Sequence, residues 1–293
     1  MGPKVNVSEK EYSIEKVRAS RAGHTFHERW TARRALKLVF PQDDLHAIAI
    51  EGLSTSDPAY PGNAAEEVAD LVLYYGSGDT FETCQKLDTI QFKYRTNGQA
   101  ATSSYLKKTI QKFADTITGY EKEVSPEEVD KKLSFSFVTN CEFAGHLWEA
   151  IRHLQGEDEP VSKAGRRQLI NLTKWCDEKG IKPSRLFART TFQAGTADLA
   201  VHNRKLRRTL CDWSASADYQ SRTRLFELTE LVREKAGPRG QSDNLIKRED
   251  VLDALGCDLE DLFPAETRFI DVGNVVPRPA QAEVSDLLRR SDA

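Results

Sequence analysis

Residues 68–95 (VADLVLYYGSGDTFETCQKLDTIQFKYR) constrain the fold of this 293-residue chain most, because two apolar-rich runs there flank a Gly/Ser/Asp loop. In a β-strand, side chains two residues apart lie on the same face. The first run therefore places Asp70 beside Val72 and Tyr74, as the one charge on an otherwise apolar face. A carboxylate in such surroundings is costly unless a metal ion or a neighbouring ammonium compensates it. The pattern predicts two strands, the first carrying a compensated carboxylate.

The second run places Gln91 and Lys93 on one face of a strand and Phe92 on the other. Hydrolysis of a phosphodiester needs a divalent cation that polarises the phosphoryl oxygen and a positive charge that positions water. Mg²⁺ prefers carboxylate and carbonyl oxygens, so Asp70 with Gln91 or with the backbone carbonyl of Phe92 forms a candidate site, for Mg²⁺ or alternatively Mn²⁺. Lys93 would supply the ammonium. On spacing alone a Gln-x-Lys strand is more typical of an exposed face, and that interpretation stays open.

Two further acids are candidates for completing this site. Glu28 lies on the flank of a predicted helix, and Glu51 lies at the end of a predicted strand. The spacing of Glu28 alone favours an ordinary solvated helix charge. His24 and His27 precede Glu28, and surface histidines are a more common interpretation of them than metal or proton-transfer residues.

The rest of the chain shows helix and strand patterns. Before a polar break at 156–165 we expect a helix at about 13–40 with a break near Gly23, strands at 45–53, 68–75 and 89–95, a helix at 105–118, a helix start at 125, a strand at 133–139 and a helix at 142–154. The buried stripe of the helix at 105–118 would be Leu106, Ile110, Phe113 and Ile117. Beyond it we expect helices at about 165–179, 195–213, 221–236 and 247–255, with one strand near 185–193. The third strand, its following helix and the fourth strand would form a parallel pair through a right-handed crossover.

Composition narrows the class of protein. No apolar run reaches the roughly 18 residues that a membrane span needs, and the N-terminus lacks the apolar core of a secretory signal, so we expect a cytoplasmic protein with no membrane partner. The five cysteines are scattered without a CxxC pair, which argues against structural zinc and a disulfide framework. A net charge of −3 argues against a uniformly basic nucleic-acid-binding surface.

Positive charge is nevertheless concentrated locally. Between residues 89 and 114 there are five basic residues and no acidic one; they are Lys93, Arg95, Lys107, Lys108 and Lys112. This segment begins at the candidate site, so we expect it to face phosphate groups. A second basic cluster at residues 204–208 is more typical of a solvated helix face than of a DNA-facing patch.

The order of elements, with an acid on the second strand and Gln-x-Lys on the third, resembles the PD-(D/E)xK nuclease superfamily, and Gln91 resembles its Mrr-like branch. The stretches AGHTFHERWTARRALKLV, AIEG, VADLVLYYG, IQFKY and FVTNCEF are similar to the double-stranded DNA endonuclease effector domain of bacterial antiphage systems. That domain occurs fused to SAVED sensors and to STAND NTPases. The resemblance covers residues 22–155 well, and the helical part to about residue 263 more loosely.

This resemblance implies an α/β fold with a restriction-endonuclease-like αβββαβ core and a mainly α-helical C-terminal extension. It implies that Asp70, Gln91 and Lys93 are catalytic, that Glu28 often joins them, and that Glu51 is a weaker candidate. The chain departs from the superfamily pattern at Ala69, where the motif proline would lie, and at Gln91, where an acid is commonest. Because Gln91 replaces an acid, the site has one carboxylate fewer than usual, and we expect Glu28 and Glu51 to matter more for metal affinity.

We therefore expect a nuclease core at 13–155, a mainly helical accessory region at 165–263 and a linker at 264–293 toward a possible NTPase or sensor domain. The expected activity is Mg²⁺-dependent endonucleolytic cleavage of double-stranded DNA in antiphage defence. Because cutting both strands needs two sites, we also expect a homo-oligomer whose assembly regulates activity. The alternatives are RNA as the substrate and a catalytically inactive module of the same fold that binds nucleic acid or a protein.

Overall fold

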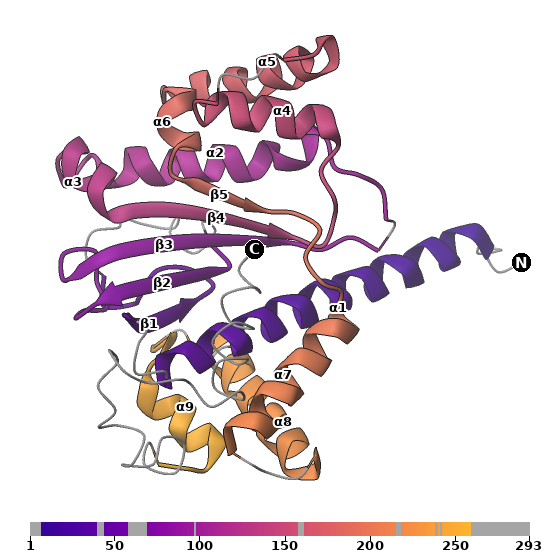
Figure 1. Ribbon diagram of the computed structural model, residues 1–293, viewed down its shortest axis with the longest axis vertical. Coiled ribbons are helices and arrows are strands. Elements are labelled where there is room, and N and C mark those ends of the chain that lie inside the picture. Colours follow the sequence, from indigo (N-terminus) through magenta and orange to yellow (C-terminus); the bar gives the residue numbers. More distant parts are fainter. Residues whose placement is uncertain are drawn as a thin grey trace, which may run out of the picture.

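The computed structural model describes residues 7–39, 44–57, 69–96, 98–157, 161–214, 218–237, 240 and 242–258. It is a mixed α/β structure in which helices cover both faces of a central sheet (Figure 1). The elements up to the fourth strand are α1 (Val7–Ala35), η1 (Leu36–Val39), β1 (Leu45–Ile50), β2 (Leu71–Gly76), β3 (Cys84–Lys93), α2 (Ser103–Tyr120), α3 (Pro126–Lys132) and β4 (Leu133–Thr139). They are followed by α4 (Gly145–Leu154), α5 (Lys163–Asp177), α6 (Pro183–Phe187), β5 (Thr190–Gln193), α7 (Leu199–Ser214), α8 (Asp218–Ala236), β6 (Leu245–Ile246) and α9 (Arg248–Leu255).

The sheet has six strands in the order β5-β4-β3-β2-β1-β6. The pairs β1/β2, β2/β3 and β1/β6 are antiparallel, whereas β3/β4 and β4/β5 are parallel. The predicted parallel pair of third and fourth strands is confirmed, with α2 and α3 in the crossover. In its register Gln91 lies beside Phe137, and Lys93 beside Thr139.

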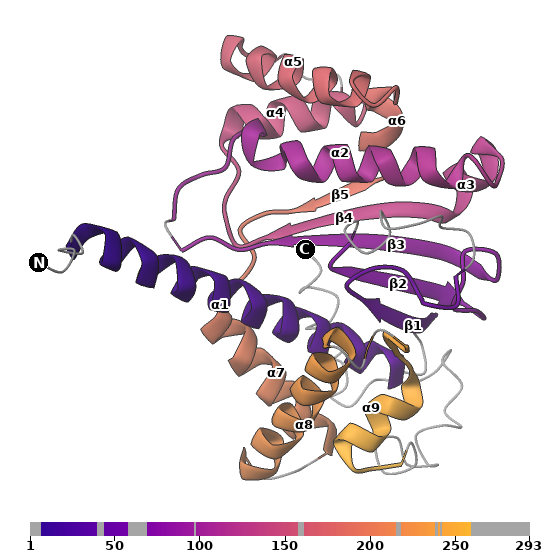
Figure 2. The same cartoon turned by 180° about the vertical axis from the view of Figure 1, so that it is seen from behind.

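Alternation along the strands divides the core into two layers. On one face Val72 and Tyr74 pack with the buried stripe of α2. On the other face Ile90 and Phe92 pack with residues of α1, α7, α8 and α9. Figure 2 shows these two helical layers on opposite sides of the sheet. The α2 stripe is the predicted one, Leu106, Ile110, Phe113 and Ile117, and all four side chains are fully buried.

Several boundaries differ from the predicted ones. Helix α1 begins at Val7, passes through Gly23 without a break and gives way to a 3-10 turn, so the predicted break there is wrong. Strand β1 ends at Ile50 and not at residue 53, because Glu51 and Gly52 have φ values of 53° and 134°, which turn the chain out of the sheet. Strand β3 begins already at Cys84, in a stretch predicted as loop, and β6 was not predicted at all.

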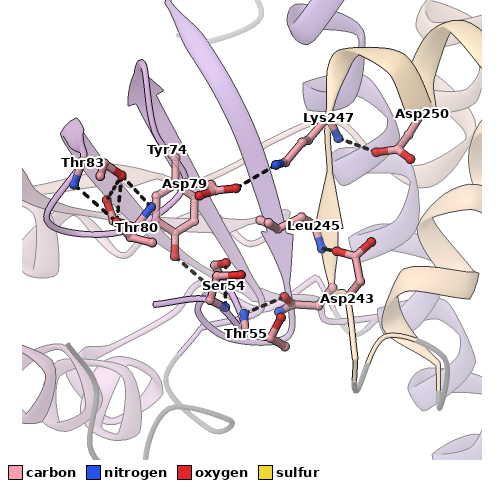
Figure 3. Close-up of polar contacts among 12 residues, drawn as sticks. Ser54, Thr55, Tyr74, Asp79, Thr80, Thr83, Asp243, Leu245, Lys247 and Asp250 are labelled. Carbon is pink, nitrogen blue, oxygen red and sulfur yellow. Dashed lines mark hydrogen bonds and ion pairs between the residues drawn. The ribbon is translucent and has the colours of Figure 1, made fainter. Parts of the chain in front are cut away.

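The edge strand β6 is fixed by polar contacts (Figure 3). Asn244, just before it, accepts a backbone hydrogen bond from Ile50 at 3.1 Å and donates its amide to the Ile50 carbonyl at 3.0 Å. Just after it, the Lys247 ammonium lies 2.8 Å from the Asp79 carboxylate of the β2–β3 connection. Nearby, the Ser54 backbone N–H donates to the Tyr74 hydroxyl at 2.9 Å. A strand of two residues is thus held in place by side chains that reach across the sheet.

Strands β5 and β6 belong to the region predicted as a helical accessory part, yet they pair within the same sheet as β1–β4. The division at residues 156–165 stays a prediction, and the predicted linker at 264–293 lies outside the described residues. In the part of the chain that the structure describes, no helix is long and apolar enough to cross a membrane.

Truncation of Phe113 tests the α2–sheet packing. Its ring stacks on Phe135 of β4 at 4.5 Å between centroids, and both side chains are fully buried. We expect Phe113→Ala to lower the free energy of unfolding by about 3–5 kcal/mol, measured by denaturant titration. The matched control, Ile170→Ala on the 65% exposed side chain of α5, should change it by about 0.5 kcal/mol at most. Equal losses in the two variants would contradict this packing.

Candidate functional site

Asp70 lies immediately before β2 and is fixed by its backbone on both sides. Its N–H donates to the Ile90 carbonyl at 3.0 Å, and its carbonyl accepts from the Glu51 N–H at 3.1 Å. These bonds join the end of β1, the start of β2 and the end of β3. The half-buried Asp70 side chain therefore lies where three central strands meet.

The Asp70 carboxylate is compensated by hydrogen-bond donors of β3. Its Oδ2 accepts from the Phe92 backbone N–H at 2.6 Å and from the Gln91 Nε2. Charge-assisted hydrogen bonds of this kind are stronger than neutral ones. The sequence predicted a compensated carboxylate beside Gln91, and the structure brings these two side chains into contact.

The Gln91 side chain is 8% exposed, and its Oε1 is a buried oxygen that has no hydrogen-bond partner among the residues that the structure describes. The terminal amide can rotate, so Gln91 can turn either Nε2 or Oε1 toward Asp70. With Oε1 turned inward, an amide oxygen and a carboxylate oxygen would face one another. Ile90 directs its carbonyl toward Asp70, and the two-residue repeat of the strand places the Phe92 carbonyl on the same edge.

These oxygens suit a hard divalent cation. Mg²⁺ and Mn²⁺ prefer carboxylate, carbonyl and water oxygens, and Mg²⁺ keeps several waters when protein ligands are few. Among the described residues no group of three His, Cys, Asp or Glu side chains is arranged to hold a metal ion. The donor set therefore fits a mainly hydrated Mg²⁺ held by Asp70, Gln91 and the Phe92 carbonyl, and it does not resemble a closed structural metal site.

Lys93 lies on the same face, two residues beyond Gln91. Its Nζ donates to the Tyr105 carbonyl in the first turn of α2 at 2.5 Å and lies 4.8 Å from the Tyr105 ring centroid. Burial, reinforced by nearby cations, lowers the pKa of Lys93 to about 8, while the Asp70 carboxylate partly opposes this shift. Lys93 and Asp70 are thus electrostatically coupled, although the described residues include no direct ion pair between them.

Three of the four other predicted phosphate-facing residues surround Lys93. The Arg95 guanidinium lies 3.9 Å above the Tyr105 ring, and Arg95, Lys108 and Lys112 all contribute to the lowered pKa of Lys93. Lys107 points elsewhere, with its ammonium 6.0 Å from the Trp175 ring centroid of α5. The basic segment predicted from the sequence is therefore divided between the Lys93 side and the α5 side of α2.

The two other predicted acids lie in different surroundings. Both Glu28 oxygens pair with the Arg233 guanidinium of α8, at 2.9 and 3.0 Å, so this carboxylate is held by α8. Glu51 has an exposed side chain, and partial burial together with the Asp70 charge raises its carboxyl pKa. The structure brings Glu51 close to Asp70, whereas Glu28 is held in an ion pair.

His27 is the helix α1 residue whose charge interacts with Asp70. Burial lowers the pKa of His27, Asp70 opposes the shift, and the imidazole packs 5.0 Å from the Phe92 ring. Sequence reasoning treated His27 as a surface histidine and selected its neighbour Glu28. Its three-residue spacing from Trp30, in the buried stripe of the helix, is the signal that could have indicated its inward orientation.

No family model and no curated protein sequence matches this chain. Solved structures of the Acinetobacter baumannii Cap4 SAVED/CARF-domain containing receptor are similar to it at 15% sequence identity. The complex with the cyclic trinucleotide 3'3'3'-cAAA gives a TM-score of 0.42 and covers 78% of this chain and 43% of that chain. The receptor determined without a named ligand gives 0.42, with 78% and 44% covered. This chain thus spans less than half the length of these receptors, and a likeness at this level assigns no function to it.

Replacing Lys93 by methionine tests its electrostatic surroundings. Because the folded state lowers the Lys93 pKa, the charged side chain destabilises the fold below about pH 8, and this cost disappears as the pH rises from 8 toward the ordinary lysine value of 10.5. We expect Lys93→Met to be more stable than wild type by about 1–3 kcal/mol at pH 7 in metal-free buffer, and the difference to shrink above pH 8. Chemical denaturation of both proteins at pH 6–10 measures this stability difference and its decrease with pH.

The control for this experiment is Lys86→Met, on the exposed residue near the other end of β3. Its stability relative to wild type should stay nearly constant across the same pH range. A Lys93→Met curve that runs parallel to wild type from pH 6 to 10 would contradict the account of Lys93.

Proposed function

We propose that this chain is a metal-dependent endonuclease that hydrolyses phosphodiester bonds of double-stranded DNA. The observation that carries the proposal is one cluster on one face of the sheet. There the Asp70 carboxylate contacts the Gln91 amide, and Lys93, on the same face of β3 as Gln91, interacts electrostatically with Asp70. A carboxylate, an amide oxygen that is unpaired within the described residues and a half-buried ammonium are groups that metal-assisted attack on a phosphodiester can use.

Asp70, Gln91 and the Phe92 carbonyl would hold Mg²⁺, or alternatively Mn²⁺. When bound, such an ion polarises a phosphoryl oxygen and makes its own water more acidic. The chain's part is to fix the oxygen donors. The Phe92 N–H holds Asp70 Oδ2 at 2.6 Å, which keeps the carboxylate oriented.

Lys93 would orient the attacking water and counter the negative charge that develops on the phosphoryl group. Its contact with the Tyr105 carbonyl restrains the ammonium near the start of α2. With a pKa of about 8, Lys93 is close to the point where it can also exchange a proton with water near neutral pH. Positioning and charge stabilisation thus reside in one side chain.

Lys108, Lys112 and Arg95 would bind the phosphates that flank the scissile bond. Contacts to phosphate fix the position of the duplex but do not read its sequence. The proposal therefore includes weak sequence preference and a steep dependence on salt concentration.

The wider biological role follows the sequence resemblance. We propose that the nuclease is the effector of an antiphage defence system and that oligomeric assembly regulates it, because two sites are needed to cut two strands. A fused or associated STAND NTPase or sensor domain would provide the activating signal.

A catalytically inactive module of the same fold is the second candidate, and two observations favour it. Gln91 stands where an acid is commonest in the superfamily, and Glu28 is paired with Arg233. The cluster around Lys93 then retains Asp70 and the exposed Glu51 as its acids. Such a site could still bind nucleic acid through its cations without cleaving it.

Plasmid cleavage with and without Mg²⁺ separates the two candidates. We expect wild type to nick or linearise plasmid only with the metal, and Asp70→Ala and Lys93→Ala each to reduce the rate by about 100-fold or more. Lys86→Ala, which removes an exposed lysine from the same strand, is the matched control and should cut like wild type. Native mass measurements over a concentration series should accompany the assay, so that cutting is compared with assembly.

The outcomes are distinct. No cutting by the assembled wild type in Mg²⁺ or Mn²⁺, or equal cutting by the Asp70 and Lys93 variants, overturns the enzyme assignment. A parallel arm with RNA of the same sequence identifies the substrate class, and preferential cleavage of RNA would overturn DNA as the substrate.

A further inference from the structure

We infer that α5 belongs to the same nucleic-acid surface, and that Arg167 and Lys174 contact DNA phosphates beyond the reach of Lys108 and Lys112. This inference rests on the proposed function and adds to it a second element of the DNA interface. It concerns the α5 stripe, which we define as Lys163, Arg167 and Lys174.

Helix α5 packs beside α2 and runs parallel to it (Figure 1). The Gln168 Oε1 accepts from the Ser103 backbone N–H at 2.8 Å, and the Asn171 Nδ2 donates to the Ser103 hydroxyl at 3.1 Å. Further along, the Gln111 Nε2 donates to the Glu178 carboxylate at 3.3 Å. The two Ser103 contacts fix α5 against the first turn of α2, whose Tyr105 carbonyl accepts from Lys93.

The α5 stripe is a consequence of helical spacing. Its three residues are separated by four and seven positions, which places them on one side of a helix of 3.6 residues per turn. All three side chains are exposed, whereas Leu172, Trp175 and Cys176 on the inner side are buried. At 1.5 Å per residue the stripe is about 16 Å long, comparable to the rise of about five nucleotides along one DNA strand.

Lys107 connects this stripe to the cations beside Lys93. It is exposed on α2 next to Lys108, and its ammonium lies over the Trp175 ring of α5. The basic surface therefore continues from Lys93 across α2 to α5 without leaving this side of the sheet. Lys107 thus points toward α5, away from the other predicted phosphate ligands.

Acidic residues interrupt this surface little. Glu178 lies 3.9 Å from Lys174, but both side chains are largely exposed, and pairs of this kind contribute little. Asp115 is paired with Lys179 at 2.8 Å. Arg167 makes no ion pair within the described residues. Lys163 and Arg167 thus keep exposed positive charge of the kind that a phosphate backbone attracts.

Binding of a fluorescent 20-base-pair duplex to the 293-residue chain tests the inference, with EDTA present so that nothing is cut. Arg167→Glu/Lys174→Glu should weaken binding by about tenfold or more at moderate salt, and the milder Arg167→Gln/Lys174→Gln should weaken it less. In the neutral variant the slope of log affinity against log salt should fall by about 2, because each lost phosphate contact removes about 0.9. The matched control is Arg204→Glu/Lys205→Glu, which reverses two exposed charges on α7, on the opposite side of the sheet.

Unchanged binding by the α5 variants, equal weakening by the α7 control, or no duplex binding by wild type would each overturn this inference. Circular dichroism of each variant shows that the fold is retained. The plasmid-cleavage assay tests the proposed function separately, because that function is wrong if no Mg²⁺-dependent cutting is observed. If the chain binds DNA through α5 but does not cut it, the inference about α5 stands and the enzyme assignment is wrong.

Discussion

The hydrogen bond from the Phe92 backbone N–H to the Asp70 carboxylate is the interaction on which the site depends. A half-buried carboxylate is tolerated only where donors or cations compensate it, and here the donors come from the neighbouring strand. The bond couples the start of β2 to the end of β3, and it places Gln91 against Asp70. The parallel crossover then carries the chain through α2, whose first turn holds Lys93. The relative positions of Asp70, Gln91 and Lys93 thus follow from the way β2, β3 and α2 are connected.

Scarcity of carboxylates sets the chemistry that this site can support. Asp70 contacts Gln91, Glu51 is exposed, and Glu28 is bound by Arg233 of α8. A divalent cation in such a site would keep most of its water, and its affinity would depend on Asp70 more than in a site with two or three acids. The positive charge of Lys93 and its neighbours lies close by, which favours a phosphate ligand and disfavours a tightly held bare metal. Metal and nucleic acid would therefore bind together more readily than either alone.

Sequence reasoning found the features that depend on local periodicity. The strand at 133–139, the buried stripe of α2 and the common face of Asp70, Gln91 and Lys93 all follow from repeats of 2 or 3.6 residues. Features that depend on distant partners were not accessible in this way. Glu28 pairs with Arg233, 205 residues later, and Lys107 turns toward Trp175. The turn after Ile50 depends on a positive φ at Glu51. This conformation is uncommon for non-glycine residues, so the residue type does not indicate it.

Binding of Mn²⁺, measured by electron paramagnetic resonance titration of the intact chain, tests the central claim most directly. Mn²⁺ reports binding without any requirement for cleavage. The account predicts one site per chain whose affinity falls about tenfold or more in Asp70→Asn and in Gln91→Leu, with Glu28→Gln close to wild type because Arg233 already holds Glu28. Binding that is unaffected by Asp70→Asn and Gln91→Leu, or that depends on Glu28 alone, would contradict it.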